Sequence, residues 1–474
     1  MGTLDRLYAF MRLRRATGYL VGGTVRDALL GRERYDIDVT VPGDAIALAR
    51  AFADEIGAAF YVMDEEFGVA RVIDESNSAR RIVDFAQLRG DSIEQDLATR
   101  DFTINAMAAD ISAGPWQERD LVDPFSGRDD LDARRIRALS GQVFDNDPVR
   151  LMRAVRFEAT LGFGLDPHTE AIVRREARKL VDAPPERLRD EFYKLLAADN
   201  SYRHIRRLDE LGLLQFVLPE VTSLKGVPQA TPHRYDVFSH TLHTLEALET
   251  VQRGGYLDLA QGAFAEQLSM HFSETLADDR RRGVLLRLGT LLHDIGKPAS
   301  RKVNGDAAVP FAGHEDVGTD IAEKTLRRLR FSNDEMGLLT TVIAGHMLPM
   351  QLANGRTVSD LAIYRYFRAA GSAGVDIAVH AWCDLRARSA QAQPLETDAS
   401  LQAVIARLLD RYYHARDKVV EPPALVNGRD VIAVLDIPQG PLVGKCLEAV
   451  REAQAGGQVT SREQALEFLR HWQP

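Results

Sequence analysis

The spacing of apolar residues separates an opening region of mixed periods from a longer region whose period is helical. In the opening region, the strict alternation over Tyr35–Val41, which ends at Pro42-Gly43, is typical of a strand followed by a turn. Further strands are predicted at 18–21, 58–63, 69–74 and 80–85, and helices at 4–14, 25–30 and 45–56. This pattern favours a small α+β domain that ends after the turn at Asp123–Gly127.

From Pro148 onward the pattern is helical. Amphipathic helices are predicted at 150–161, 168–180, 185–197 and 202–211. A polar loop at 227–234 leads to a second helical block at 238–392, and a linker at 392–396 leads to further helices. We therefore expect four parts: an α+β head at 1–140, and all-α regions at 141–232, 233–392 and 393–474.

Length and composition limit the classes of protein that fit. At roughly 150 residues per domain, 474 residues correspond to about three domains. The 45% hydrophobic and 27% charged residues are ordinary for globular proteins, which excludes a chain dominated by disorder, collagen repeats or coiled coil. The formal net charge of −10 argues against binding polyanions through overall charge, but it allows a nucleic-acid enzyme whose basic residues form one stripe.

Three features bear on the compartment. The two cysteines, Cys383 and Cys446, are too few for a disulfide framework or a Cys-rich zinc site, which suggests a reducing environment. The N-terminal Met1–Arg15 lacks the apolar core of a signal peptide, and no uninterrupted apolar run is long enough to span a bilayer. We expect a soluble cytoplasmic protein with no membrane partner.

A pair of carboxylates marks the first candidate site. Asp36 and Asp38 are separated by one residue on a predicted strand, so both side chains leave the same face. Two adjacent carboxylates repel each other unless a cation lies between them, and Mg²⁺ prefers such oxygen ligands. Taken alone, the pair favours a solvated polar face on an edge strand. Asp84, on a later strand, is a candidate third carboxylate.

The residues upstream change that balance. Gly22 and Gly23 lie between a strand and the start of a helix, followed by Arg26. Backbone amides exposed at such a turn form an anion cradle suited to a triphosphate, and Arg26 adds positive charge. The two glycines alone would indicate only a tight turn. A phosphate cradle followed by a metal-binding strand is the arrangement that phosphoryl transfer requires.

Several ordered motifs resemble a known family, the class II nucleotidyltransferases, which include bacterial tRNA nucleotidyltransferases (CCA-adding enzymes) and poly(A) polymerases. The resemblance covers most of the chain and implies a polymerase-beta-like head followed by a helical neck, body and tail. The motifs are Gly22–Asp27, Asp36–Asp38, Arg100–Ala108, Asp147–Phe157, Glu186–Leu196, Leu425–Asp430 and Gly440-Pro441.

The resemblance implies specific roles. Asp36 and Asp38 would hold two Mg²⁺ ions that activate the primer 3′-hydroxyl and stabilise the leaving pyrophosphate. Arg100 and Asn105 match the motif that contacts the ribose. Asp147 and Arg150, three residues apart on a predicted helix, would pair with the edge of the incoming base. The arginines of the same helix are also expected to bind nucleotide, with a solvated basic face as the alternative: Arg150, Arg153 and Arg156.

Two departures from the family pattern concern nucleotide selection. The family usually has Glu before the templating Asp, where this chain has Asn146, which cannot pair through charge. The segment between Phe85 and Arg100 is short, whereas full CCA-adding and A-adding members carry a longer flexible loop there. This resembles the CC-adding branch and predicts that synthesis stops after two cytidines. The poly(A) polymerase branch fits less well, because Tyr61–Arg71 lacks its Gly-Arg-Arg-Phe-type segment.

The second candidate site is a set of histidines and aspartates on predicted helices. Their order resembles the HD phosphohydrolase superfamily, which places an HD domain at 233–392. Neutral imidazoles and carboxylates form a borderline site suited to Mn²⁺, Fe²⁺, Ni²⁺, Co²⁺ or Mg²⁺, whose bound water would attack a phosphoester. A degenerate module that only holds tRNA is the alternative. The predicted ligands are His240, His293, Asp294, His314, His346 and Asp384.

A run of basic residues follows the head. They repeat near helical spacing and predict a stripe that binds acceptor-stem phosphates, with ordinary ion pairs to Glu170, Glu176 and Glu186 as the alternative. Two other basic runs, 280–282 and 324–330, are expected to be solvated helix faces. The stripe comprises Arg150, Arg153, Arg156, Arg174, Arg175, Arg178, Lys179, Arg187, Arg189, Arg203, Arg206 and Arg207.

Together these features predict a template-independent nucleotidyltransferase that adds CMP to the tRNA 3′ end, with an HD module behind it. Its expected partners are the tRNA acceptor stem and 3′ end, CTP, and ATP if full CCA is made. The competing functions are a poly(A) polymerase, a metal phosphohydrolase with a vestigial head, and a noncatalytic tRNA-binding protein. Intact Asp36, Asp38, Arg100, Asp147 and Arg150 argue against the vestigial head.

Overall fold

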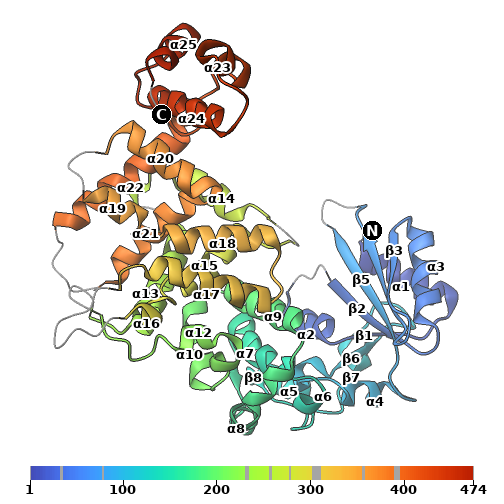
Figure 1. The fold of residues 1–474 in the computed structure, drawn as a ribbon. Helices are drawn as coiled ribbons and strands as arrows, with labels where there is room; N and C mark the ends of the chain where they lie inside the picture. The colour runs from blue at the N-terminus through green and yellow to red at the C-terminus, as the bar shows by residue number, and fades with distance from the viewer. Residues whose placement is uncertain are drawn as a thin grey trace. The chain divides into compact units, whose positions relative to one another are not determined.

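The computed structural model describes residues 2–32, 36–76, 80–229, 234–255, 259–276, 279–301, 311–354, 358–388 and 396–472. The chain forms two compact units, Met1–Ala183 and Pro184–Pro474. The first unit contains the large sheet, and the described residues of the second form helices joined by loops, with no strand (Figure 1). The division falls inside the region predicted as neck and body.

A seven-stranded mixed sheet forms the centre of the first unit, in the order β3-β4-β5-β2-β1-β6-β7. Strands β2 and β5 run parallel, and the other neighbouring pairs are antiparallel. The strands are β1 (Tyr19–Val21), β2 (Asp36–Val41), β3 (Ala59–Asp64), β4 (Val69–Asp74), β5 (Arg81–Gln87), β6 (Ala108–Asp110) and β7 (Leu121–Val122).

The register of this sheet sets the rows of side chains that define the site. Asp38 on β2 pairs with Asp84 on β5, which in turn pairs with Arg71 on β4. Two residues further along, Thr40 pairs with Ala86, which pairs with Val69. Because alternate residues of a strand share a face, both rows lie on the same face of the sheet.

An aromatic row anchors helices to the sheet. Asp44 caps the helix Ala45–Ile56 by accepting a hydrogen bond from the Ala47 amide, and Gly57 ends it in the left-handed region. Phe10 packs on Phe52 with ring centroids 5.1 Å apart, and Phe52 packs on Phe85 at 5.9 Å.

The helices of this unit are α1 (Thr3–Arg14), α2 (Gly23–Leu29), α3 (Ala45–Ile56), α4 (Ile93–Ala98), α5 (Gly127–Asp132), α6 (Val143–Asn146), α7 (Val149–Leu161) and α8 (Pro167–Glu176).

The elements predicted from periodicity are confirmed with small changes of boundary. The helix at 45–56 and the strand at 69–74 have the predicted bounds. The single helix predicted at 168–180 is wrong only at its end, because α8 ends at Glu176 and a 3₁₀ helix, Ala177–Asp182, follows. Tyr35, the predicted start of β2, lies outside the described residues.

The second unit is built around α15 (Arg282–Leu292), all of whose residues are buried. This helix contacts α13, α18, α9 and α14. The other helices are α9 (Pro185–Ala197), α10 (Ser201–Glu210), α11 (Leu214–Val217), α12 (Pro219–Thr222), α13 (Val237–Gln252), α14 (Ala265–Ser273), α16 (Lys297–Ser300), α17 (His314–Arg328), α18 (Asn333–Gly345), α19 (Leu348–Ala353), α20 (Asp360–Ala370), α21 (Gly374–Ala387), α22 (Glu396–His414), α23 (Gly428–Leu435), α24 (Pro441–Ala455) and α25 (Arg462–His471).

One stretch of this unit, Asn333–Ala353, is long and apolar enough to cross a membrane by length and composition alone, and the described residues contain one such stretch. It comprises α18 and α19. Leu339, Val342 and Ile343 on α18 are fully buried inside the protein. The stretch therefore supplies core side chains to the helical unit.

The prediction of a solvated helix face at 280–282 is wrong for two of its three arginines. Arg280 donates to Glu335 at 2.9 Å, and Arg282 donates to Asp376 at 2.6 Å; both arginines are buried. They lie where the core helix α15 begins, and the surrounding helices supply carboxylates that compensate the buried charge. In the run 324–330, the charged side chains are exposed, as predicted.

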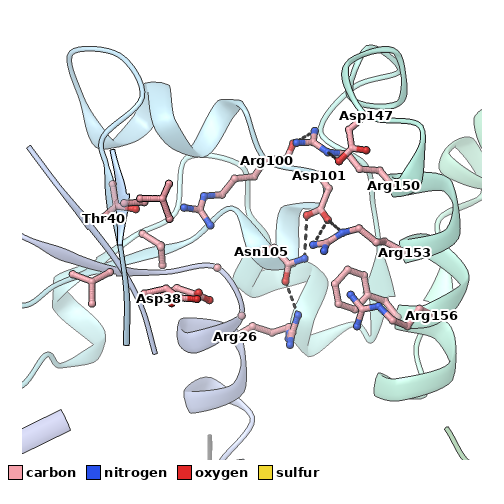
Figure 2. A pocket seen from close by; sticks show the side chains of 18 residues that line it. Arg26, Asp38, Thr40, Arg100, Asp101, Asn105, Asp147, Arg150, Arg153 and Arg156 are labelled. Carbon is pink, nitrogen blue, oxygen red and sulfur yellow. Dashed lines mark hydrogen bonds and ion pairs between the residues drawn. The ribbon is translucent and has the colours of Figure 1, made fainter. Parts of the chain in front are cut away.

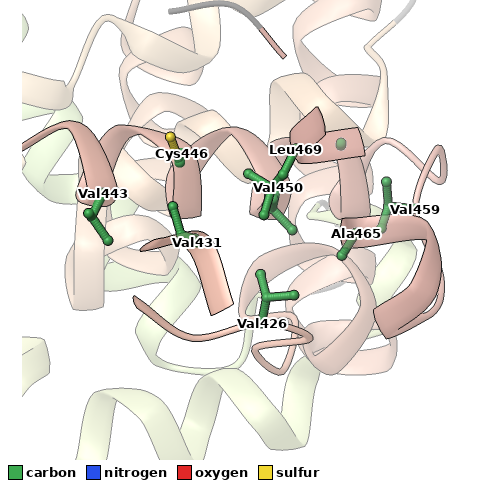
Figure 3. Packing of buried hydrophobic residues seen from close by; sticks show 9 residues of the cluster. Val426, Val431, Val443, Cys446, Val450, Val459, Ala465 and Leu469 are labelled. Carbon is green, nitrogen blue, oxygen red and sulfur yellow. The ribbon is translucent and has the colours of Figure 1, made fainter. Parts of the chain in front are cut away.

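The last three helices share a hydrophobic cluster of their own (Figure 3). Asn427 caps α23 through hydrogen bonds from the amides of Arg429 and Asp430. The predicted linker at 392–396 lies outside the described residues, apart from Glu396, where α22 begins. The cluster consists of Val426, Val431, Val443, Cys446, Val450, Ala453, Val459, Ala465 and Leu469.

Gly296 permits the close approach of two segments in the helical unit. A Cβ at this position would lie 2.0 Å from the carbonyl oxygen of His314 and 2.5 Å from the amide nitrogen of Gly318, both on α17. We expect Gly296→Ala to destabilise this unit by about 2 kcal/mol, because overpacked backbone cannot yield cheaply. The thermal unfolding midpoint measures the effect.

Gly337→Ala is the matched control. Gly337 lies within α18, and a Cβ there meets nothing within 4 Å. Replacing a helical glycine with alanine at an open position should leave the midpoint unchanged or raise it, since alanine is favoured in helices by up to about 1 kcal/mol. Equal destabilisation by both substitutions would contradict the role given to Gly296.

Candidate functional site

A cavity of about 550 Å³ opens on the sheet face that carries Asp38 (Figure 2). Its wall begins where β1 runs into Gly22, which has a φ of +61° and lies at the start of α2. This backbone conformation favours glycine, and a Cβ at Gly22 would also lie 2.7 Å from Nη1 of Arg100. The Thr24 hydroxyl accepts a hydrogen bond from the Asp38 amide at 2.8 Å, which ties the turn to β2.

The predicted carboxylates take different places around this cavity. Asp38 and Asp84 line it from paired positions on β2 and β5. Asp36 lies at the exposed start of β2, outside the lining residues but on the same strand face as Asp38. Arg71 holds Asp84 in a bidentate ion pair, with Nε to Oδ1 and Nη2 to Oδ2 both 2.8 Å. The candidate third carboxylate is therefore already engaged by a guanidinium.

A buried relay of four side chains crosses the floor of the cavity. Arg26 donates to Oδ1 of Asn105 at 2.6 Å, and Asn105 donates to Oδ1 of Asp101 at 3.0 Å. The other oxygen of Asp101 accepts from Nε of Arg153 at 2.7 Å. Burial alone would raise the pKa of Asp101, but the charge of Arg153 and hydrogen bonds from Asn105, Arg153 and the Phe102 amide lower it. Asp101 is therefore an anion that connects α2 with α7.

Sequence reasoning missed Asp101. Asp101 belongs to the Arg100–Ala108 motif, but the family resemblance assigned roles only to Arg100 and Asn105 of that motif. Its position could have indicated this role, because Asp101 directly precedes the mostly apolar segment that starts at Phe102. A carboxylate buried with such a segment requires a cationic or hydrogen-bonding partner. Arg153, which follows 52 residues later in the chain, is that partner.

The predicted pairing of Asp147 and Arg150 is correct in proximity but wrong in secondary structure. Asp147 lies in the link between α6 and α7, outside both helices, and accepts a hydrogen bond from the Val149 amide at 3.2 Å. Its carboxylate is 3.8 Å from Nε of Arg150, which lies in the first turn of α7. The backbone is extended at Asp147, so the two side chains meet although Asp147 lies outside the helix.

Arg150 is fixed by main-chain carbonyls. Its guanidinium donates to the carbonyls of Thr99 at 3.0 Å and Arg100 at 3.3 Å. Arg156 lies over the ring of Phe157, with Cζ 4.0 Å from the ring centroid, and Arg26 and Arg153 also lie against that ring. All predicted nucleotide-binding residues line the one cavity: Gly22, Gly23, Arg26, Arg100, Asn105, Asp147, Arg150, Arg153 and Arg156.

The second candidate site lies in the helical unit, where the predicted ligands form two groups. His240, His293 and Asp384 form one group, and in each group the ligand atoms lie within 4.8 Å of one another. His240 Nε2 is 2.7 Å from Oδ1 of Asp384, and His293 Nε2 is 3.8 Å from the same oxygen. The second group is Asp294, His314 and His346.

Asp294 connects the two groups. Its Oδ2 lies 3.1 Å from Nε2 of His293 and accepts from Nζ of Lys297 at 2.6 Å. Its Oδ1 lies 3.4 Å from Nε2 of His314 and 3.9 Å from Nε2 of His346. Burial would raise the pKa of Asp294, but the charges of His293 and Lys297 hold it well below its usual range.

The histidine tautomers fit a metal site. The Nδ1 atoms of His293, His314 and His346 lie 2.7–2.8 Å from backbone carbonyl oxygens three residues earlier. A carbonyl can only accept, so each Nδ1 carries a proton and Nε2 is the ring nitrogen left to bind a cation once it is unprotonated. Burial lowers the pKa of His346 to about 4, which keeps that imidazole neutral. This nitrogen and oxygen donor set suits a borderline divalent cation.

His380 is a buried member of the cluster that sequence reasoning missed. Its ring centroid lies 4.7 Å from that of His293, and its Nδ1 is 3.2 Å from the Thr290 hydroxyl. Burial, and after it the neighbouring His293, lowers the pKa of His380 well below the usual value. The available signal was its spacing, because His380 precedes Asp384 by four residues and so shares its helix face.

Three family models match consecutive parts of the chain: "Poly A polymerase head domain" at residues 18–137, "Probable RNA and SrmB- binding site of polymerase A" at 162–225, and "HD domain" at 237–414. The first match contains the carboxylate strand and three of the four relay residues, Arg26, Asp101 and Asn105. The third contains both groups of metal-ligand candidates.

Two curated relatives match nearly the whole chain. The A-adding tRNA nucleotidyltransferase of Deinococcus radiodurans is 32% identical over 459 residues, which cover 96% of this chain and 95% of the relative. The CC-adding tRNA nucleotidyltransferase of Synechocystis is 30% identical over 451 residues, covering 95% and 92%. A CCA-adding enzyme solved with CTP has a similar fold, with a TM-score of 0.62 and 22% identity, covering 98% and 94%.

The three family models follow one another along the chain without overlap. Similarity at this level over almost the full length of both chains shows the family. The chain belongs to the tRNA nucleotidyltransferases and is an enzyme of that class with an HD domain.

Proposed function

We propose that the chain adds CMP to the tRNA 3′ end and stops after two cytidines. The observation that carries this proposal is the anchoring of Arg150. Its guanidinium is hydrogen bonded to the carbonyls of Thr99 and Arg100, at the end of the short segment that follows β5. That segment is itself tied down, since Ile93 and Leu97 of α4 are buried in a cluster with Val21.

A fixed Arg150 supports a single base specificity. Under the proposal, Asp147 accepts from the exocyclic amine of cytosine and Arg150 donates to its ring and carbonyl acceptors. Re-forming this pocket for adenine would require Arg150 to leave two carbonyls whose positions α4 holds. Adenine addition is the second candidate, because the Deinococcus radiodurans relative is an A-adding enzyme.

The carboxylates and arginines divide the chemistry between them. Asp36 and Asp38 would hold Mg²⁺, which supplies activation of the 3′-hydroxyl and neutralises the departing pyrophosphate. Oxygen donors on one strand face fit a hard cation. Arg26 and Arg153 bring positive charge to the triphosphate, with their orientation fixed by Asn105 and Asp101. Arg100, beside Gly22, would face the ribose.

Primer extension tests the base specificity. We expect a tRNA that lacks CCA to gain two CMP residues from a mixture of CTP and ATP, and a tRNA ending in CC to gain nothing. The products are resolved on a sequencing gel. Efficient addition of AMP to the second tRNA would contradict CC addition and support the adenine alternative. Asp38→Asn should reduce CMP addition at least about 100-fold, which assigns the activity to this cavity.

Arg71 provides a further prediction about the metal dependence. Its guanidinium neutralises Asp84 beside Asp38, and so places a positive charge near the expected Mg²⁺ position. We expect Arg71→Ser to lower the Mg²⁺ concentration for half-maximal CMP addition by roughly threefold or more, because like-charge repulsion is removed. Arg71→Lys, which keeps the charge, is the control; an unchanged midpoint in Arg71→Ser would argue against this role.

For the helical unit we propose a metal-dependent phosphohydrolase activity on small phosphoesters. The supporting observation is the shared tautomer of His293, His314 and His346, which presents three Nε2 atoms to Asp294 and Asp384. A divalent cation bound there, such as Mn²⁺, Ni²⁺, Co²⁺, Fe²⁺ or Mg²⁺, supplies an activated water. A module that only holds tRNA is the alternative.

His293→Ala separates the two activities. We expect loss of Mn²⁺- or Ni²⁺-stimulated hydrolysis of a 2′,3′-cyclic nucleotide, by at least about 100-fold, because His293 lies in one ligand group and contacts the other. CMP addition to tRNA should be unchanged. Loss of both activities in this variant would contradict two independent sites.

The proposed partners are the tRNA acceptor stem, its 3′ end and CTP, in a cytoplasmic setting. Of the predicted basic stripe, Arg174 pairs with Glu170 at 2.7 Å and Lys179 with Glu176 at 2.6 Å. Exposed pairs of this kind contribute little and exchange readily for phosphates. They therefore leave the proposed phosphate contact available, and its measure is the salt dependence of tRNA binding.

A further inference from the structure

An exposed aromatic ring stands at the turn between β3 and β4. Phe67 is 56% exposed. Its amide donates to Oδ1 of Asp64 at 2.9 Å, and the next residue, Gly68, has a φ of +60°. The Gly68 carbonyl accepts from the Gln87 amide at 3.0 Å, and a Cβ on Gly68 would lie 2.9 Å from the Gln87 side chain. The turn is thus fixed on both sides of a ring that faces solvent.

Phe67 lines a second cavity of about 230 Å³. Thr40, Ala86 and Val69, one row of the sheet, line both this cavity and the nucleotide cavity, as do Arg100 and Arg150. This row lies two residues along the strands from the row that contains Asp38, a separation of about 7 Å. The second cavity therefore begins about one nucleotide away from the catalytic carboxylates.

Arg89 completes the site. Its Cζ lies 5.7 Å from the centroid of the Phe67 ring, and its amide donates to Oδ1 of Asp96 at 3.2 Å. Both Arg89 and Phe67 line the second cavity. An exposed ring next to a guanidinium, at the edge of a basic cavity, suits an unpaired nucleotide, because the base can stack on the ring and the phosphate can pair with arginine.

We propose that Phe67 and Arg89 form a stacking subsite for the last, unpaired base of the RNA primer. The proposal rests on the nucleotide addition proposed above. Under that function the base of the incoming nucleotide is met by Asp147 and Arg150. The primer must place its 3′-hydroxyl at Asp38, so its terminal base lies one nucleotide away, in the second cavity. The ring of Phe67 stacks on that base, and Arg89 pairs with its phosphate.

The test uses a tRNA transcript without CCA whose last base is 2-aminopurine, a fluorescent base that is quenched on stacking. We expect quenching on binding to the full-length protein and its loss in Phe67→Ala. The same substitution should raise the KM for tRNA about tenfold and leave the KM for CTP unchanged. Phe67→Trp should restore both readouts, because the ring is retained.

Tyr61→Ala is the matched control, since Tyr61 is a 54% exposed aromatic residue on β3 that lines neither cavity. It should change neither readout. An effect of Phe67→Ala on the KM for CTP alone, or an equal effect of Tyr61→Ala, would overturn the proposal. Asp38→Asn should still show quenching of 2-aminopurine, because this substitution leaves the ring of Phe67 in place. If the wild-type protein shows quenching but adds no CMP, the proposed function is contradicted and the stacking subsite is not.

Discussion

The buried carboxylate of Asp101 is the constraint on which the nucleotide cavity depends. It receives Arg153 from α7 on one side and Asn105 on the other, and Asn105 in turn fixes Arg26 on α2. Removing one partner from such a network leaves an uncompensated charge in the core, which is far more costly than losing an exposed ion pair. The relay therefore holds two cationic side chains in position before any triphosphate arrives, so binding does not have to organise them.

The same physical strategy recurs in the helical unit with different chemistry. The buried helix α15 ends at Leu292, directly before His293, and the rings of His293, His314 and His346 are each oriented by a backbone carbonyl. Both sites are thus built from buried polar groups whose partners lie on separate elements. Since each site lies within one compact unit, neither requires the other for its geometry.

Periodicity predicted the α+β head and the helical remainder, and the family resemblance supplied most residues that the structure brings together in the two sites, though not Asp101 or His380. Burial and pairing across long sequence separations could not be read from those patterns. Arg280 and Arg282 looked like a solvated run because their carboxylate partners, such as Glu335 and Asp376, are far away in the chain. The same limit hid the ion pair of Arg71 with Asp84, which depends on strand register. Asp147 lies outside the predicted helix because its backbone is extended. The spacing of apolar residues does not reveal such a local backbone conformation.

The orienting oxygens of the histidine cluster have a consequence for substitutions. The acceptors for His293, His314 and His346 are the main-chain carbonyls of Thr290, Phe311 and Ile343. Substitution of a side chain at these three positions does not delete a carbonyl. The orientation of the ligands is therefore set by the backbone, at a helix end for His293 and His346 and in the turn before α17 for His314. Replacing the side chains at the three acceptor positions would leave the same ring nitrogens directed at the site.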